Sequence, residues 1–208
     1  MRIEHQDFEF NAISGKLDLV VRDSVNSGPL LAPAGGIIYV YIPGVDKSFS
    51  ATTLTAAADR LIAIPFPVHR RCQLSAVYAQ VTTAATGFMK LAVYDSNAIY
   101  YPSTLIQGSS DIGTSSTGLK TWSPVNLILD PGMYFLAAHW SASPTMRAVP
   151  IANVARFYGF STDLATALGV FWQTTSGYGS GLPSAFPSGA TLQTTAMYAI
   201  GVAVSNPG

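Results

Sequence analysis

The stretch "MYFLAAHW" (133–140) constrains the fold most, because it has the composition of a β-strand but no polar face. Its residues form two alternating sets: Met133, Phe135, Ala137 and His139, and Tyr134, Leu136, Ala138 and Trp140. Side chains alternate between the two faces of a strand, so each face here carries large apolar or aromatic groups. A fold that contains this strand must therefore cover both of its faces.

The tripeptide Asp130-Pro131-Gly132 directly precedes this strand. Proline fixes φ near about −65°, and glycine accepts the positive φ that a type II turn needs at its third residue. In the preceding stretch, apolar residues alternate up to Leu129, which is typical of a half-buried strand. We therefore interpret residues 123–140 as a β-hairpin.

Strands without a polar face recur at 36–42, 60–68 and 196–204. Such strands normally belong to parallel sheets that helices cover, but this sequence predicts too few helices for that. We expect a second sheet to cover one face and another subunit to cover the other. The pattern thus favours a homo-oligomer, because monomers seldom expose large apolar patches.

The composition predicts an all-β chain, since Gly and Pro are spread along it and β-branched and aromatic residues are common. The expected strands are 17–22, 36–42, 60–66, 72–82, 88–95, 120–129, 132–140, 145–151, 168–173 and 196–204. Helix formers predict two short helices at 53–61 and 161–169. We divide the chain into an N-terminal attachment and oligomerisation segment, 1–52, and one β-sandwich domain, 53–208.

Charge is sparse and balanced, which makes nucleic acids and anionic membranes poor partners. The chain has 11 basic and 11 acidic residues, and charged residues make up 11% of it, against roughly 25% in a typical domain. No apolar run approaches the about 18 residues of a membrane-spanning helix. We expect no membrane insertion.

No constellation of catalytic or metal-binding residues stands out. The only glutamates, Glu4 and Glu9, lie in the N-terminal segment, and the histidines His5, His69 and His139 have no metal-ligand spacing. The aspartates at strand starts and turns fit structural roles, and the sequence has no G-x-S-x-G nucleophile motif. We predict a non-enzymatic protein without cofactor or metal.

Binding through aromatic side chains is the more credible activity. Aromatic rings pack against the C–H-rich faces of sugars, and a few polar groups add directed hydrogen bonds. Five aromatic residues outside the expected strand cores are candidates for binding a receptor glycan: Tyr100, Tyr101, Trp172, Tyr178 and Phe186. The turn-rich segment 174–191 is the expected recognition loop.

Four motifs carry a family resemblance. They lie at Asp59 to Phe66 ("DRLIAIPF"), Thr83 to Asp95 ("TAATGFMKLAVYD"), Tyr101 to Ile106 ("YPSTLI") and Leu129 to Ala137 ("LDPGMYFLA"). In this order and spacing, residues 53–204 resemble the jelly-roll head domain of tailed-bacteriophage virion proteins, which occurs at the tips of tail fibres and spikes and in other appendages. The resemblance implies a jelly-roll-like antiparallel β-sandwich.

The opening "FEFNAISGKLDLV" (8–20) resembles a short tag near the start of such appendage proteins. The tag implies attachment or assembly through Phe8, Phe10, Leu17 and Leu19. Proteins of this kind are usually homotrimers that contact other virion proteins. The resemblance thus implies a structural protein of the virion, assembled in the host cytoplasm, that acts as a tail fibre or tip in host attachment.

Two alternatives remain open. A capsid decoration or head-fibre protein would use residues 1–52 to bind the shell. A monomeric carbohydrate-binding module would need an exposed aromatic platform and no second subunit.

Overall fold

The computed structural model describes residues 51–154, 158 and 169–205, together with the backbone of strands at 7–11, 16–20 and 39–41. The predicted all-β class is confirmed, because two antiparallel sheets pack together as a β-sandwich. Among the described residues, the helical segments are two single 3₁₀ turns, η2 (Ile151–Asn153) and η3 (Tyr178–Ser180). The jelly-roll order of strands stays a prediction.

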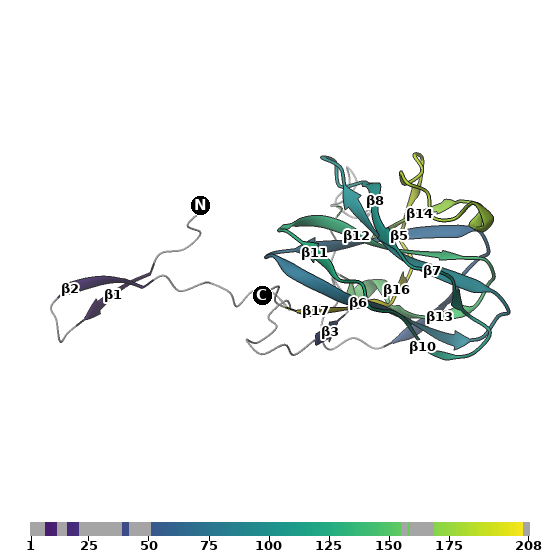
Figure 1. The fold of residues 1–208 in the computed structure, drawn as a ribbon, viewed down its shortest axis with the longest axis horizontal. Helices are drawn as coiled ribbons and strands as arrows, with labels where there is room; N and C mark the ends of the chain where they lie inside the picture. The colour runs from purple at the N-terminus through teal and green to yellow at the C-terminus, as the bar shows by residue number, and fades with distance from the viewer. Residues whose placement is uncertain are drawn as a thin grey trace.

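The first sheet has eight strands, which form the lower layer in Figure 1. Its main path runs β16 (Met197–Tyr198), β13 (Thr145–Val149), β6 (Cys72–Thr83), β17 (Ile200–Ser205) and β3 (Tyr39–Tyr41). β10 (Gly118–Trp122) and β11 (Leu127–Leu129) also pair with β6, and β4 (Thr52–Thr55) pairs with β13.

The second sheet has seven strands, which form the upper layer. Its path runs β15 (Thr191–Gln193), β14 (Phe171–Thr175), β5 (Arg60–Val68), β12 (Gly132–Trp140), β7 (Phe88–Ser96) and β8 (Pro102–Gly108), and β9 (Ile112–Gly113) pairs with β7. β12, the strand without a polar face, is central, with β5 on one side and β7 on the other.

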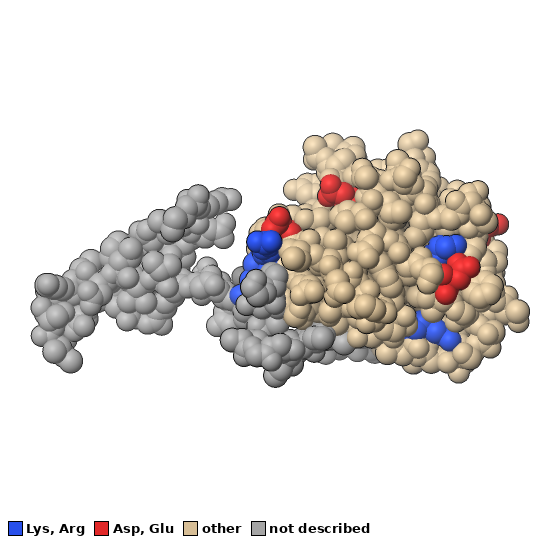
Figure 2. Space-filling view, viewed as in Figure 1, with Lys and Arg blue, Asp and Glu red and all other residues tan. Residues whose placement is uncertain are grey.

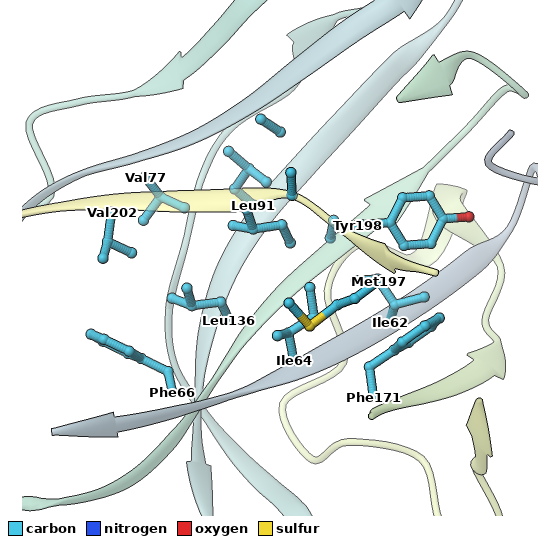
Figure 3. Close-up of a cluster of buried hydrophobic side chains, with 14 of the residues drawn as sticks. Ile62, Ile64, Phe66, Val77, Leu91, Leu136, Phe171, Met197, Tyr198 and Val202 are labelled. Carbon is cyan, nitrogen blue, oxygen red and sulfur yellow. The ribbon is translucent and has the colours of Figure 1, made fainter. Parts of the chain in front are cut away.

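Alternate residues of the facing strands fill the space between the sheets. Figure 3 shows Val77 and Val202 of the first sheet facing a group from the second sheet that includes Ile64 and Leu136. These side chains are at most 2% exposed. This cluster also contains Ala138 and Trp140, so it covers one of the two apolar faces of β12.

The interpretation of 123–140 as a hairpin is wrong. β11 pairs with β6 in the first sheet, whereas β12 pairs with β5 and β7 in the second. The turn therefore carries the chain from one sheet to the other. Gly132 also lacks the positive φ that a type II turn requires, so the turn is not type II. A turn signal reverses the chain direction, but it does not specify which sheet the next strand joins.

Residues 176–190, which we call the strap, run across the outer face of the second sheet. The Leu105 amide donates to the Ser184 carbonyl (2.8 Å), and the Phe186 amide donates to the Ser103 carbonyl (2.7 Å). The Tyr94 hydroxyl donates to the Pro183 carbonyl (2.9 Å). Backbone and side-chain hydrogen bonds thus join the strap to β8 and β7.

The strap covers the second apolar face of β12. Phe135 and Ala137 form one buried cluster with Phe186 and Ala190 of the strap. The interpretation that another subunit must cover this face is therefore corrected, because the same chain covers it. The homotrimer stays a prediction, but β12 is no longer an argument for it.

The helix predicted at 53–61 is wrong. Thr52–Thr55 forms β4, which pairs with β13, and β5 begins at Arg60. Here β-branched residues and tertiary pairing prevail over the helix propensity of the alanines. The helix predicted at 161–169 lies almost wholly outside the described residues.

The N-terminal segment contributes to two sheets. β1 (Asp7–Asn11) and β2 (Lys16–Val20) pair with each other in a separate two-stranded sheet. β3 pairs with β17 and so extends the first sheet of the sandwich. The boundary at residue 52 stays a prediction, although part of the segment before it belongs to a sandwich sheet.

His139 fixes the start of the strap to β12. Its side chain is fully buried, and its Nε2 lies 2.7 Å from the Ser176 carbonyl oxygen. Its Nδ1 has no hydrogen-bond partner among the described residues. Tyr178 packs against the imidazole ring at 5.0 Å between centroids. A proton added to Nδ1 would place an unpaired charge in this buried site, and burial lowers the pKa of His139.

We therefore expect the free energy of unfolding to decrease as the pH falls. The unfolded chain binds the His139 proton more tightly than the folded protein does. This contribution to stability is complete above the ordinary histidine pKa of about 6.5, and it is lost progressively as the pH falls from there through the lowered pKa of folded His139. Urea denaturation between pH 7.5 and 5.5 measures the change. The His139→Gln variant should show a smaller decrease, and a variant at the exposed His69, His69→Gln, should match the wild type. Equal decreases in all three would contradict this role.

Candidate functional site

The loop between β7 and β8 is held in one conformation by Asn97. The Asn97 Oδ1 accepts hydrogen bonds from the amides of Ile99 (3.0 Å) and Tyr101 (2.9 Å). The Asn97 amide donates to the Tyr101 carbonyl, and the Tyr100 amide donates to the Asn97 carbonyl. This local network makes the loop rigid without using core contacts.

Tyr100 sits at the exposed tip of this loop in an unfavourable backbone conformation. Its φ is +57°, and the residue is 57% exposed. The left-handed region costs a residue with a Cβ roughly 1–2 kcal/mol, and only Gly, Asn and Asp enter it readily. A bulky aromatic residue that keeps this conformation while more than half exposed gains little packing in return, which points to a role in binding.

Two hollows meet at Tyr100. One has a volume of about 410 Å³ and is lined by Asp95, Ser96, Asn97, Ala98, Tyr100, Pro131, Gly132, Met133 and Tyr134. The other, of about 280 Å³, is lined by Pro65, Tyr100, Met133 and Tyr158. Tyr100 and Met133 line both, so the hollows form one continuous surface, which we call the Tyr100 site.

The polar groups of the site come from Asp95, Asn97 and Tyr134. Asp95 and Tyr134 are directly opposite each other on β7 and β12. The Asp95 Oδ1 accepts the Ser96 amide (2.8 Å), and the Tyr134 hydroxyl donates to the Asp130 carbonyl (3.1 Å). Burial raises the pKa of Tyr134, and the carboxylates of Asp95 and Asp130 raise it further. The site therefore combines aromatic surface with a carboxylate and an amide.

A stack of aromatic rings supports the loop from behind. The Tyr158 hydroxyl donates to the Tyr100 carbonyl (3.1 Å) and accepts from the Trp172 indole N–H (2.6 Å). Trp172 also packs against Tyr101, with centroids 4.7 Å apart. The Tyr101 hydroxyl donates to the Pro187 carbonyl and accepts the Ala190 amide (3.1 Å). The position of Tyr100 is thus coupled to the strap.

The five aromatic residues predicted to bind a glycan differ in exposure and in what they pack against. Tyr100 is exposed, and Tyr101 and Trp172 are partly buried in the supporting stack. Phe186 packs against Tyr94 and Tyr101, and Tyr178 packs against His139; both are buried. Their rings are therefore closed to a ligand, and segment 174–191 acts largely as a cover of the sheet. The sequence did not identify Asn97, Met133 and Tyr134 as site residues. The signal that could have pointed to this region is the adjacent turn at Asp130-Pro131-Gly132, part of which also lines the site.

Two other described carboxylates, those of Asp59 and Asp111, have structural partners. Asp59 accepts the Tyr178 amide (2.7 Å). Asp111 pairs with Lys90 (2.9 Å) and accepts the Tyr178 hydroxyl (2.8 Å), and the hydrogen bond from Lys90 is the main reason why the pKa of Asp111 is lowered. Among the described residues, no group of three or more His, Cys, Asp or Glu could hold a metal ion.

The predicted attachment residues lie on the β1–β2 hairpin. The register places Phe8 opposite Leu19 and Phe10 opposite Leu17, so alternation puts all four on one face. Their side chains lie outside the described residues.

No protein-family model matches the chain, and no curated protein matches its sequence. In the part of the chain that the structure describes, no helix is long and apolar enough to cross a membrane.

We expect Tyr100→Asn to keep or increase stability, although it replaces a large aromatic residue. Asparagine tolerates the left-handed region, so relief of backbone strain contributes up to about 1 kcal/mol. The free energy of unfolding from urea denaturation measures the effect. The neighbouring Tyr101→Phe variant is the control, because it leaves the Ala190 amide without its partner and should cost about 1–3 kcal/mol. A loss of more than 1 kcal/mol in Tyr100→Asn would show that the Tyr100 ring is structural.

Proposed function

We propose that this chain is a virion protein of a tailed bacteriophage that attaches the particle to its host by binding a surface glycan at the Tyr100 site. The observation that carries the proposal is Tyr100 itself, a strained and exposed aromatic residue between two hollows. Around it lie the Asp95 carboxylate, near the end of β7, and the Asn97 amide, on a loop held by hydrogen bonds. This combination suits the recognition of sugar rings.

Sugars bind proteins through two kinds of contact, and the site offers both. The Tyr100 ring provides an apolar surface for the C–H groups of a sugar. The Asp95 carboxylate can accept hydrogen bonds from sugar hydroxyls, and the Asn97 amide nitrogen can donate them. The larger hollow is the more open of the two, as expected for a site that receives the end of a polysaccharide chain.

The virion role rests on the resemblance of residues 53–204 to phage appendage heads and of residues 8–20 to their N-terminal tag. The tag forms the β1–β2 hairpin, with Phe8, Phe10, Leu17 and Leu19 on one face. A two-stranded hairpin is marginally stable by itself. Docking of this face against another virion protein or other copies of the chain would stabilise it. The proposed protein is a homotrimer without enzymatic activity.

We expect Tyr100→Ala to weaken binding to host cells or their purified surface polysaccharide about tenfold. Loss of one aromatic contact on a sugar corresponds to roughly 1.4 kcal/mol. Binding of the labelled full chain to cells gives the dissociation constant. The matched control is Phe88→Ala, since Phe88 is 48% exposed and lies at the other end of β7. Equal affinity in Tyr100→Ala and wild type would refute the assignment of the site.

A monomeric carbohydrate-binding module is the second candidate, and one observation favours it. The strap covers the outer face of β12 within the chain, so this face needs no other subunit. Both candidates bind glycans at the Tyr100 site and differ in their oligomeric state.

Light scattering on the full chain separates the two candidates. The virion proposal expects a molar mass of three times 21.9 kDa. Phe8→Ser combined with Phe10→Ser should reduce this mass to that of one chain if the hairpin holds the subunits together. A monomeric wild type would favour the carbohydrate-binding module instead.

A further inference from the structure

We propose that the glycan bound at the Tyr100 site is neutral, and that the site discriminates against sugars that carry a carboxylate, sulfate or phosphate. This inference rests on the proposed function and specifies its ligand class. It follows from the arrangement of charge and hydrogen-bonding groups around the two hollows.

Asp95 places a carboxylate in the larger hollow, and it forms no ion pair with a cation among the described residues. The residue is exposed, and its Oδ1 accepts only the adjacent Ser96 amide (2.8 Å). Its Oδ2 has no hydrogen-bond partner among the described residues. A sugar hydroxyl can donate to this oxygen, whereas an anionic group would be repelled.

A second carboxylate lies at the edge of the same hollow. Asp130 directly precedes the lining residues Pro131 and Gly132, and its carbonyl accepts the Tyr134 hydroxyl. The Arg71 Nε lies 3.5 Å from the Asp130 Oδ1, but both side chains are more than 60% exposed. An ion pair so exposed to water compensates little charge. The carboxylates of Asp95 and Asp130 also act on the Tyr134 ring, where both raise the phenol pKa.

The described lining of the site offers a neutral donor and no cation. None of the lining residues that the structure describes is Lys, Arg or His. The Asn97 Oδ1 is used by two backbone amides, which leaves its Nδ2 as the donor for a ligand. Proteins that bind acidic sugars commonly need Arg or Lys to compensate the charge. A carboxylate acceptor beside an amide donor instead matches a pair of neighbouring hydroxyls.

The expected discrimination is modest, because the site is open to water. Two like charges about 4 Å apart in water repel enough to weaken binding about fivefold. Salt should reduce this effect, because at 1 M ionic strength the screening length is about 3 Å. Stacking on Tyr100 should respond little to salt. Charge discrimination can thus be measured separately from binding itself.

The experiment uses matched sugar pairs with the full chain. Methyl glycosides of glucose, galactose and mannose are compared with the corresponding uronates, which differ only in a carboxylate at C6. Binding is followed by NMR through the ¹³C-labelled methyl group of Met133, which lines both hollows. Each titration is repeated at low and at about 1 M salt, for the wild type and for Asp95→Asn. Asp111→Asn is the control, because Asp111 does not line the site and pairs with Lys90, which lies nearer the start of β7 than Asp95 does.

We expect each neutral sugar that binds to be preferred about fivefold over its uronate at low salt. The ratio should approach one at high salt and in Asp95→Asn, and it should be unchanged in Asp111→Asn. Equal or tighter binding of the uronates, still abolished by Tyr100→Ala, overturns the ligand class while the proposed function stands. If no sugar shifts the Met133 methyl signal, the glycan-binding function fails and this inference fails with it.

Discussion

The burial of β12 on both faces is the constraint on which the rest of the structure depends. The strand pairs with β5 and β7 along both edges, and the space between the sheets buries its Leu136, Ala138 and Trp140. The opposite face would expose Phe135 and Ala137 if the strap did not cover it. The strap in turn requires β8 and the aromatic stack to hold it. The Tyr100 site is therefore built on a layer that exists to complete the core.

Much of the fold could be predicted because alternation of apolar residues is a local property. Strands at 60–66, 72–82, 88–95 and 132–140 were expected close to where they lie. Pairing is not local, and this is where prediction failed. The residues 130–132 join β11 to β12, but nothing in them specifies that β12 leaves the sheet of β11. Figure 2 shows how sparse the charges on one face are, so few polar residues mark which faces are exposed.

The candidate site was only partly predictable, because residue type does not reveal exposure. Tyr178 and Phe186 are as aromatic as Tyr100, yet both belong to the strap and are buried against the second sheet. What distinguishes Tyr100 is its positive φ, set by the hydrogen bonds of Asn97, and neither is visible in composition or periodicity. The surroundings of Asp95 were equally hidden, because Tyr134 reaches it only through the pairing of β12 with β7.

The loop between β7 and β8 also bears on how such a protein can evolve. Its conformation depends on Asn97 and on backbone hydrogen bonds, and its exposed tip contributes no side chain to either buried cluster. Substitutions at Ile99 and Tyr100 can therefore change the exposed surface of the loop at little cost in stability. For the proposed binding role, this arrangement separates the residues that preserve the fold from those that would contact a ligand, so new specificities could arise without repacking the sandwich.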